Sequence, residues 1–296
     1  MTVHNRRAGI FFMLCAALSF SLMNVFARLA GDVPALQKTF FRNAVAIVVI
    51  TVLLIQKKQP IRFKKGTIPH HFLRSLFGTI GVVGNFYAVD RMLLSDATIL
   101  IELSPFFVIV FSALFLHERV ALRQWPPIFL ALLGAVFVIR PTAGVFGSSA
   151  AFVALATAVF AGAAYTMVRR LNTEGEYPTL IIFFFSAFSC LFCLPSLLLN
   201  YTPLTVRQAL FLLGAAVFGC CGQFSITTAY RYAPGSEISI FDYSQIVFSS
   251  LFGWLIFGQL ADCWSYLGYA IIIAAAMLVF LSGAKGDGEK RYDGQE

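Results

Sequence analysis

The sequence predicts an all-α integral membrane protein with ten transmembrane helices, arranged as two inverted five-helix repeats. Two observations carry this prediction: the composition, and a repeated series of apolar stretches. Of the 296 residues, 59% are apolar and 12% are charged, and the mean hydropathy is +0.81. A soluble domain typically has about a quarter of its residues charged. The composition therefore argues against a soluble enzyme, a nucleic-acid-binding protein and a disordered chain, in spite of a net charge of +8.

Ten apolar stretches approach or exceed the length that crosses a bilayer, about 20 residues of helix. They lie at residues 8–30, 35–55, 70–90, 95–116, 124–140, 149–170, 177–199, 207–230, 235–257 and 264–283. The first follows Arg6 and Arg7, but its apolar run continues to Ala30, which is longer than the core of a signal peptide. We therefore expect it to be retained as the first span.

Charge sets the expected orientation of these spans. With the N-terminus in the cytoplasm, most Lys and Arg residues fall in inner segments and few at outer ends, as the positive-inside rule requires. Arg74 is counted among the inner charges and Lys38 among the outer ones. An even number of spans returns the C-terminus to the cytoplasm, as a tail at residues 284–296. The short loops favour the plasma membrane, or the inner membrane of a Gram-negative cell.

The second half of the chain echoes the first at an offset of 141 residues, so that Gly78, for example, corresponds to Gly219. We expect a first repeat at residues 1–145 and a second at residues 146–283. Each repeat holds five spans, an odd number, so the second enters the membrane from the opposite side. Inverted repeats are typical of transporters whose substrate binds at the membrane midplane between the halves.

The fourth and ninth spans each carry one polar face. At helical spacing, the fourth span presents Ser95, Thr98, Glu102, Pro105 and Ser112, and the ninth presents Ser236, Ser239, Tyr243, Ile246 and Gly253 at the corresponding positions. A polar face on a spanning helix is expected to line a cavity or to pack against other helices rather than lipid. Pro105 is expected to bend its helix.

A membrane-embedded enzyme is the alternative from another functional class. It would need a nucleophile and base, or metal ligands, at membrane depth. The four histidines fall at expected cytoplasmic ends, and the sequence contains neither H-E-x-x-H nor G-x-S-x-G. The six cysteines have no metal-site spacing with histidine, although Cys190 and Cys193 form a C-x-x-C within an apolar run. We expect no catalytic activity, no metal and no cofactor.

Several short motifs, in order and spacing, resemble a known family. They are Phe41-Arg42-Asn43, Ser104-Pro105-Phe106-Phe107, Phe115-Leu116-His117-Glu118-Arg119, Gly134 and Ile139-Arg140-Pro141. Together they resemble the drug/metabolite transporter superfamily, specifically its two-repeat EamA branch, over nearly the whole chain. The resemblance implies ten helices, a central cavity with alternating access, and transport of small organic solutes, often by export and often coupled to ions or exchange.

The second half departs from this family pattern at two places. Ile246 stands where a proline is expected, and Gly258-Gln259 stands where Gly-Glu is common. These departures leave open whether the two halves bend and anchor alike.

Ionisable groups inside a membrane are costly and usually functional. Glu102 is expected to lie about 10 Å deep in its span, at 1.5 Å per residue, and Asp242 at a similar depth from the other side. One or both are expected to bind a cationic group or a coupling proton, the alternative being a fixed ion pair with Arg42 or Arg28. Arg42 either holds a substrate carboxylate or neutralises Glu102.

Further polar residues at internal depths complete the predicted substrate-binding set. They are Asn24, Asn85, Tyr87, Tyr165, Gln223 and Tyr243. The aromatic rings of Tyr87 and Tyr165 would suit a ring or a cationic head group. Each residue of this set has the alternative of serving only as an interhelical hydrogen bond.

The predicted function is secondary transport of a small amino-acid-like, amine or other zwitterionic or cationic metabolite across the plasma membrane. Alternating access would be coupled to a proton or cation, or would run as exchange. The runner-up is a nucleotide-sugar-type antiporter of the same superfamily, which would need several cationic groups around a diphosphate. The expected partners are the small-molecule substrate and the lipid bilayer, with no nucleic acid, and a homodimer is left open.

Overall fold

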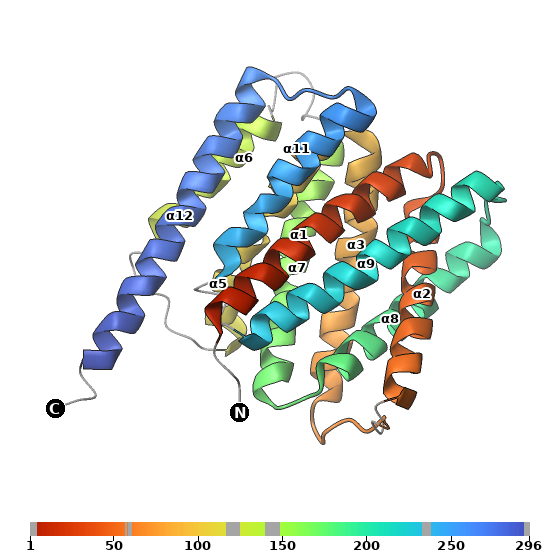
Figure 1. The fold of residues 1–296 in the computed structure, drawn as a ribbon, viewed down its shortest axis with the longest axis horizontal. Coiled ribbons are helices and arrows are strands. Elements are labelled where there is room, and N and C mark those ends of the chain that lie inside the picture. The colour runs from red at the N-terminus through yellow and green to blue at the C-terminus, as the bar shows by residue number, and fades with distance from the viewer. Residues whose placement is uncertain are drawn as a thin grey trace.

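The computed structural model describes residues 5–56, 58, 61–116, 125–139, 149–232 and 238–292. All regular structure in these residues is helical (Figure 1). The helices form ten consecutive segments, two of which are interrupted. The predicted all-α membrane fold of ten helices in two repeats is confirmed.

In the first half the helices are α1 (Arg6–Leu29), α2 (Ala35–Gln56), α3 (Ile68–Arg91), α4 (Leu94–Ile101), α5 (Ser104–Leu116) and α6 (Trp125–Ile139). In the second half they are α7 (Ser149–Thr173), α8 (Pro178–Leu199), α9 (Val206–Tyr232), the short 3-10 helix η2 (Ser239–Tyr243), α11 (Ser244–Phe257) and α12 (Cys263–Tyr292). Among the described residues, seven helical stretches have the length and apolarity of a membrane span, with α4 and α5 taken as one. The other segments are the shorter helix α6, the helix α12, whose apolar part is Cys263–Leu278, and the interrupted pair η2–α11.

Two boundaries expected from the sequence can be compared with the structure: the start of the C-terminal tail and the junction of the two repeats. The last helix, α12, continues to Tyr292 and so takes in most of the tail expected at residues 284–296. The boundary expected between residues 145 and 146 lies outside the described residues.

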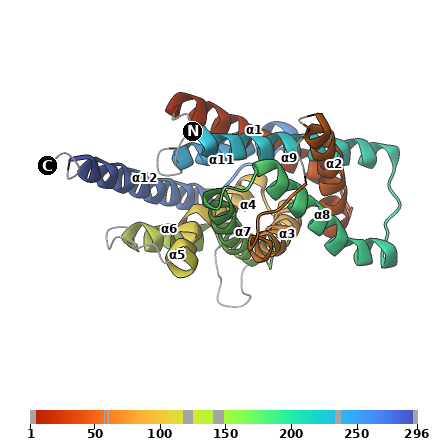
Figure 2. The same cartoon turned by 90° about the horizontal axis from the view of Figure 1, so that it is seen from below.

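The principal helix contacts join one repeat to the other. α1 packs on α9, α7 on α3, α2 on α8, α4 on α11, and α6 on α12. Exchanging the two repeats turns the α1–α9 pair into the α7–α3 pair and leaves each of the other pairs as it is. This is the pattern that a two-fold axis between the repeats produces. Figure 2 shows α1 and α9 on one side of the molecule, α3 and α7 on the other, with α2 and α8 at one end and α6 and α12 at the other.

Both interrupted segments break at corresponding positions. α4 ends at Ile101 and α5 begins at Ser104, so Glu102 lies in the break. The cause is Pro105, which has no N–H with which to continue the hydrogen bonds of the helix. In the second repeat, η2 ends at Tyr243, which is 141 residues after Glu102, and α11 follows. The second half thus breaks where the first does, without a proline.

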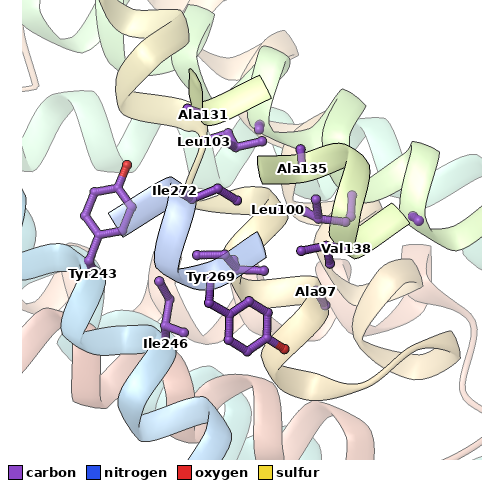
Figure 3. Packing of buried hydrophobic residues seen from close by; sticks show 14 of the residues in the cluster. Ala97, Leu100, Leu103, Ala131, Ala135, Val138, Tyr243, Ile246, Tyr269 and Ile272 are labelled. Carbon is purple, nitrogen blue, oxygen red and sulfur yellow. The ribbon is translucent and has the colours of Figure 1, made fainter. Parts of the chain in front are cut away.

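The largest apolar cluster lies where α4, α6, α11 and α12 meet (Figure 3). Its members include Leu100, Ala135, Ile246 and Ile272, which come from both repeats. The polar face of the fourth span packs against other helices here, since Thr98 Oγ1 donates a hydrogen bond to Ser249 Oγ at 2.9 Å. This packing holds the interrupted helices, and the acids at their breaks, against the centre of the molecule.

Candidate functional site

A central cavity lies between the two repeats and contains about 810 Å³ of atom-free space, including its opening. Its lining comes from α1, α2 and α3 of the first repeat, from α7, α8 and α9 of the second, and from the two interrupted segments. Its charged lining residues are two acids and two bases: Glu102, Asp242, Arg42 and Arg74. Among the described lining residues, these four formal charges balance, and they stand out in a lining that is otherwise largely apolar.

Nine residues are predicted from the sequence to bind substrate, and the structure brings seven of them together in this cavity. The seven are Asn24, Arg42, Asn85, Glu102, Tyr165, Gln223 and Asp242. Tyr87 and Tyr243 are not among the described lining residues. The ring of Tyr87 lies under the guanidinium of Arg91, with its centroid 3.9 Å from Cζ, and Tyr243 is buried in the apolar cluster.

The two acids face the cavity at the helix breaks. Glu102 lies between α4 and α5, and Asp242 lies in η2. Their carboxyl groups are near enough to repel each other. Glu102 Oε2 and Asp242 Oδ1 are buried and accept no hydrogen bond from the described residues. A break leaves backbone polar groups and side chains free to face a ligand, and transporters commonly bind ions and substrates at such discontinuous helices.

The fixed ion pair considered for these acids is not formed among the described residues. Arg28 instead donates hydrogen bonds to the carbonyl oxygens of Val89 and Met92, at 3.2 and 2.7 Å. Arg42 remains in the cavity, but no ion pair joins it to either acid in this part of the chain. Within the described ranges, the two acids therefore have no fixed basic partner.

Arg74, counted above among the inner charges, is also a cavity residue that the predicted substrate-binding set does not include. It lies six residues into α3 and is 3% exposed. Its guanidinium lies on the ring of Phe185, with Cζ 3.8 Å from the centroid, and Cζ of Arg42 lies 6.0 Å from the same centroid. Helical spacing in the sequence agrees with this placement, because Arg74, Gly78, Gly81 and Asn85 are predicted to share one face of the third span.

The remaining polar groups stiffen or shape the cavity wall. Asn85 Nδ2 donates a hydrogen bond to Asn24 Oδ1 at 2.9 Å, which links α3 to α1. Tyr165 of α7 is near enough to interact electrostatically with both acids and both arginines. The Asn24–Asn85 pair is thus an interhelical hydrogen bond that also lines the cavity.

Comparisons with known proteins agree with this architecture. The EamA-like transporter family model matches the chain twice, at residues 7–140 and 148–281. The pseudopaline exporter CntI of Pseudomonas aeruginosa (strain UCBPP-PA14) is 30% identical over 273 residues, which cover 92% of this chain and 95% of that protein. The riboflavin transporter of Vibrio cholerae serotype O1 is 27% identical over 285 residues, covering 93% and 94%.

More distant proteins are similar over comparable lengths. Human solute carrier family 35 member G1 is 26% identical over 285 residues, covering 90% of this chain and 77% of that protein. A solved crystal structure with 17% sequence identity superposes with a TM-score of 0.68 over 95% of this chain and 99% of its own. This last similarity shows the fold alone.

Proposed function

Because the chain belongs to the EamA-like transporter family, we propose that it is a secondary transporter of a small zwitterionic or cationic organic solute. Transport runs across the plasma membrane by alternating access, with both chain ends in the cytoplasm, as the distribution of Lys and Arg indicates. The observation that carries the proposal is the central cavity, which both repeats line and which holds two acids and two arginines.

The charges in the cavity favour a solute that carries a positive group. Glu102 and Asp242 supply carboxylates for an ammonium group, and neither has a fixed basic partner among the described residues. The same acids repel a diphosphate, which weighs against a nucleotide-sugar substrate. A pseudopaline exporter and a riboflavin transporter among the relatives support a small organic solute in general.

The paired acids also suit coupling to a proton or another cation. Two carboxylates in one buried site repel each other when both are ionised, so binding of a proton or a cationic group relieves the repulsion. Rocking of one repeat against the other would then expose the loaded cavity to each side in turn. The helix pairs that join the repeats supply the surface along which this motion occurs.

A ligand screen by thermal unfolding tests the substrate class. Amino acids, amines and nucleotide sugars are compared on the wild type, on Glu102→Gln and on Asp242→Asn. We expect amino acids or amines to raise the melting temperature of the wild type, and both variants to bind them at least about tenfold more weakly. Asp32→Asn, at an exposed residue outside the cavity, is the matched control and is expected to bind as the wild type does.

Two outcomes contradict the proposal. If nucleotide sugars stabilise the wild type best, the substrate class is wrong. Counterflow in proteoliposomes then tests transport with the best stabilising compound: accumulation of labelled solute against unlabelled solute supports transport, and its chemical conversion would identify an enzyme.

A further inference from the structure

We propose that Arg42 and Arg74 together form the site for a carboxylate group of the transported solute. This inference rests on the proposed transport function and deepens it, since it adds a negatively charged group to the solute and assigns a role to Arg74. The two side chains come from α2 and α3 and meet beside one aromatic ring, that of Phe185 on α8.

Three guanidinium nitrogens of these arginines are buried without an acceptor among the described residues. Arg42 is 5% exposed and Arg74 is 3% exposed. Nε and Nη1 of Arg42, and Nε of Arg74, donate no hydrogen bond to any described residue. The Phe185 ring attracts both cations through its π face, but it does not accept hydrogen bonds in the plane of the guanidinium, as an oxygen atom would.

Two other basic residues, the half-buried Arg28 and the buried Lys38, have acceptors within the fold. Arg28 donates to two backbone carbonyl oxygens, and Lys38 donates to the carbonyl oxygen of Ala27 and to the carboxylate of Asp90. These two residues lie outside the cavity lining, and oxygen atoms of the fold accept hydrogen bonds from their charged groups. Among the buried Lys and Arg residues that the structure describes, the two that line the cavity have donors without acceptors.

Placing two like charges together without an acceptor destabilises the empty protein. A buried charge without a partner is expensive, and the two guanidinium groups also repel each other. An anion that binds both would remove both costs. The planar guanidinium fork matches a carboxylate, which has two oxygens in one plane and accepts paired hydrogen bonds.

Two glycines at corresponding positions make room for the guanidinium groups. A Cβ atom on Gly78 of α3 would overlap Nη1 of Arg74, and a Cβ atom on Gly219 of α9 would lie 2.9 Å from Nε of Arg42. The two glycines are 141 residues apart, so each repeat contributes one. The space into which the arginines reach is therefore built from equivalent positions of both repeats.

The neighbouring acids decide between a carboxylate and a phosphate. Glu102 and Asp242 line the same cavity, and they repel a doubly charged phosphate more strongly than a singly charged carboxylate. A solute with a carboxylate and an ammonium group places one charge against each pair.

The test uses the purified full chain and acetate as the simplest carboxylate. Thermal unfolding is measured in sodium acetate, sodium chloride and sodium phosphate at equal ionic strength. We expect acetate to raise the melting temperature of the wild type above its value in chloride, because a ligand that binds only the folded state stabilises it. This difference should disappear in Arg42→Gln and in Arg74→Gln.

The variants also separate a binding role from a structural one. Arg74→Gln should be more stable than the wild type in chloride, since it removes an unpaired buried charge, whereas loss of a structural arginine would lower stability. Arg28→Gln is the matched control, and it should unfold at a lower temperature in all three salts and keep the acetate difference. If neither arginine variant can be purified in a folded state, Gly219→Ala replaces them in the test. Its new Cβ atom displaces the Arg42 guanidinium, so the difference in melting temperature between acetate and chloride should disappear.

Three results would overturn the inference. They are equal stability of the wild type in acetate and chloride, an acetate difference that survives both arginine substitutions, and stronger stabilisation by phosphate than by acetate. Counterflow in proteoliposomes distinguishes failure of the carboxylate site from failure of the proposed transport function. If Arg74→Gln transports carboxylate-bearing solutes as the wild type does, the carboxylate site is wrong and transport stands. If the wild type transports nothing but keeps an arginine-dependent acetate effect, transport is wrong and the site stands.

Discussion

Nζ of Lys38 lies 2.7 Å from both carboxylate oxygens of Asp90. The lysine side chain is 0% exposed and the aspartate side chain 18%. Nζ also donates a hydrogen bond to the carbonyl oxygen of Ala27 at 2.8 Å. One ammonium group of α2 thus bonds to both α1 and α3. From the sequence, Lys38 is expected only as a charge at the outer end of its span.

Lys38→Met is expected to lower the free energy of unfolding by about 3–5 kcal/mol, because it leaves the Asp90 carboxylate without its partner. Adding Asp90→Leu should recover much of this loss. Denaturant unfolding in detergent measures the free energy of unfolding of the wild type, the single variant and the double variant. Arg170→Met, which breaks an exposed pair with Glu174, is the control and should change stability by less than about 1 kcal/mol. A loss at Lys38 no larger than that of the control would contradict a buried pair.

Gly268→Ala is expected to separate α6 from α12. A Cβ atom on Gly268 would lie 2.7 Å from the carbonyl oxygen of Gly134 on the facing helix. Overpacking of this kind costs about 1–3 kcal/mol, so the melting temperature should fall. Gly253→Ala is the matched control, since its new Cβ would lie no closer than 3.7 Å to any neighbour. Equal melting temperatures for the two alanine variants would show that the α6–α12 contact tolerates a side chain.

Gln259→Leu is expected to cost about 0.5–2 kcal/mol, the usual range for loss of a helix N-terminal cap. The side-chain Oε1 of Gln259 accepts a hydrogen bond from the backbone N–H of Leu94, the first residue of α4, at 3.2 Å. Gln259→Glu keeps an acceptor at this position and should retain the wild-type melting temperature. If the leucine and glutamate variants have the same melting temperature, the hydrogen bond from Leu94 to Gln259 does not stabilise the protein.

Glu176→Ala is expected to loosen the segment between α2 and α3. Oε1 of Glu176 accepts hydrogen bonds from the backbone N–H of Lys64 at 2.7 Å and from Thr67 Oγ1 at 2.8 Å, and thereby joins the two repeats. Without the carboxylate the Lys64 amide has lost its acceptor. Hydrogen exchange by mass spectrometry should show this amide exchanging at least about tenfold faster, while amides in the middle of α3 stay protected. Unchanged exchange at Lys64 would contradict the link.

A pH dependence is expected at the neighbouring Glu174, which accepts hydrogen bonds from Arg170 and His70. Burial acts to raise the pKa of Glu174, but these hydrogen bonds outweigh it and hold the pKa below its usual value of 4.5. The stabilisation is therefore present above pH 4.5 and is lost as the pH falls further. Melting curves of the wild type and of Glu174→Gln should differ at neutral pH and converge in acid. A constant difference across this range would contradict the assignment.

Hydropathy and charge predict the spans and both cavity acids, because these signals are local: an apolar run forms a membrane helix, and a rare charge within it stands out. The direction in which a side chain points could not be predicted, because the rotation of a helix about its axis is set by its neighbours. Asp242 and Tyr243 are adjacent in the sequence, yet one lines the cavity and the other is buried in the apolar cluster.

The burial of Arg74 and Lys38 was not predictable, for a related reason. Both lie within two turns of a helix end, where a basic residue ordinarily reaches water. Each is buried by contacts with distant parts of the chain, Phe185 for Arg74 and Asp90 for Lys38. Such contacts depend on the packing of the whole bundle, which the sequence around the residue does not contain.

The two helix breaks differ in one chemical respect. The break at Glu102 is followed by Pro105, whose nitrogen has no hydrogen to donate, so α4 and α5 cannot join as one regular helix. Every residue from Ser239 to Ile246 retains its backbone N–H, so η2 and α11 have the donors needed to straighten into one rod. The first break is therefore fixed by the sequence, whereas the second depends on packing alone. The equivalence of the two repeats thus ends, in chemical terms, at the positions where the fold makes them most alike.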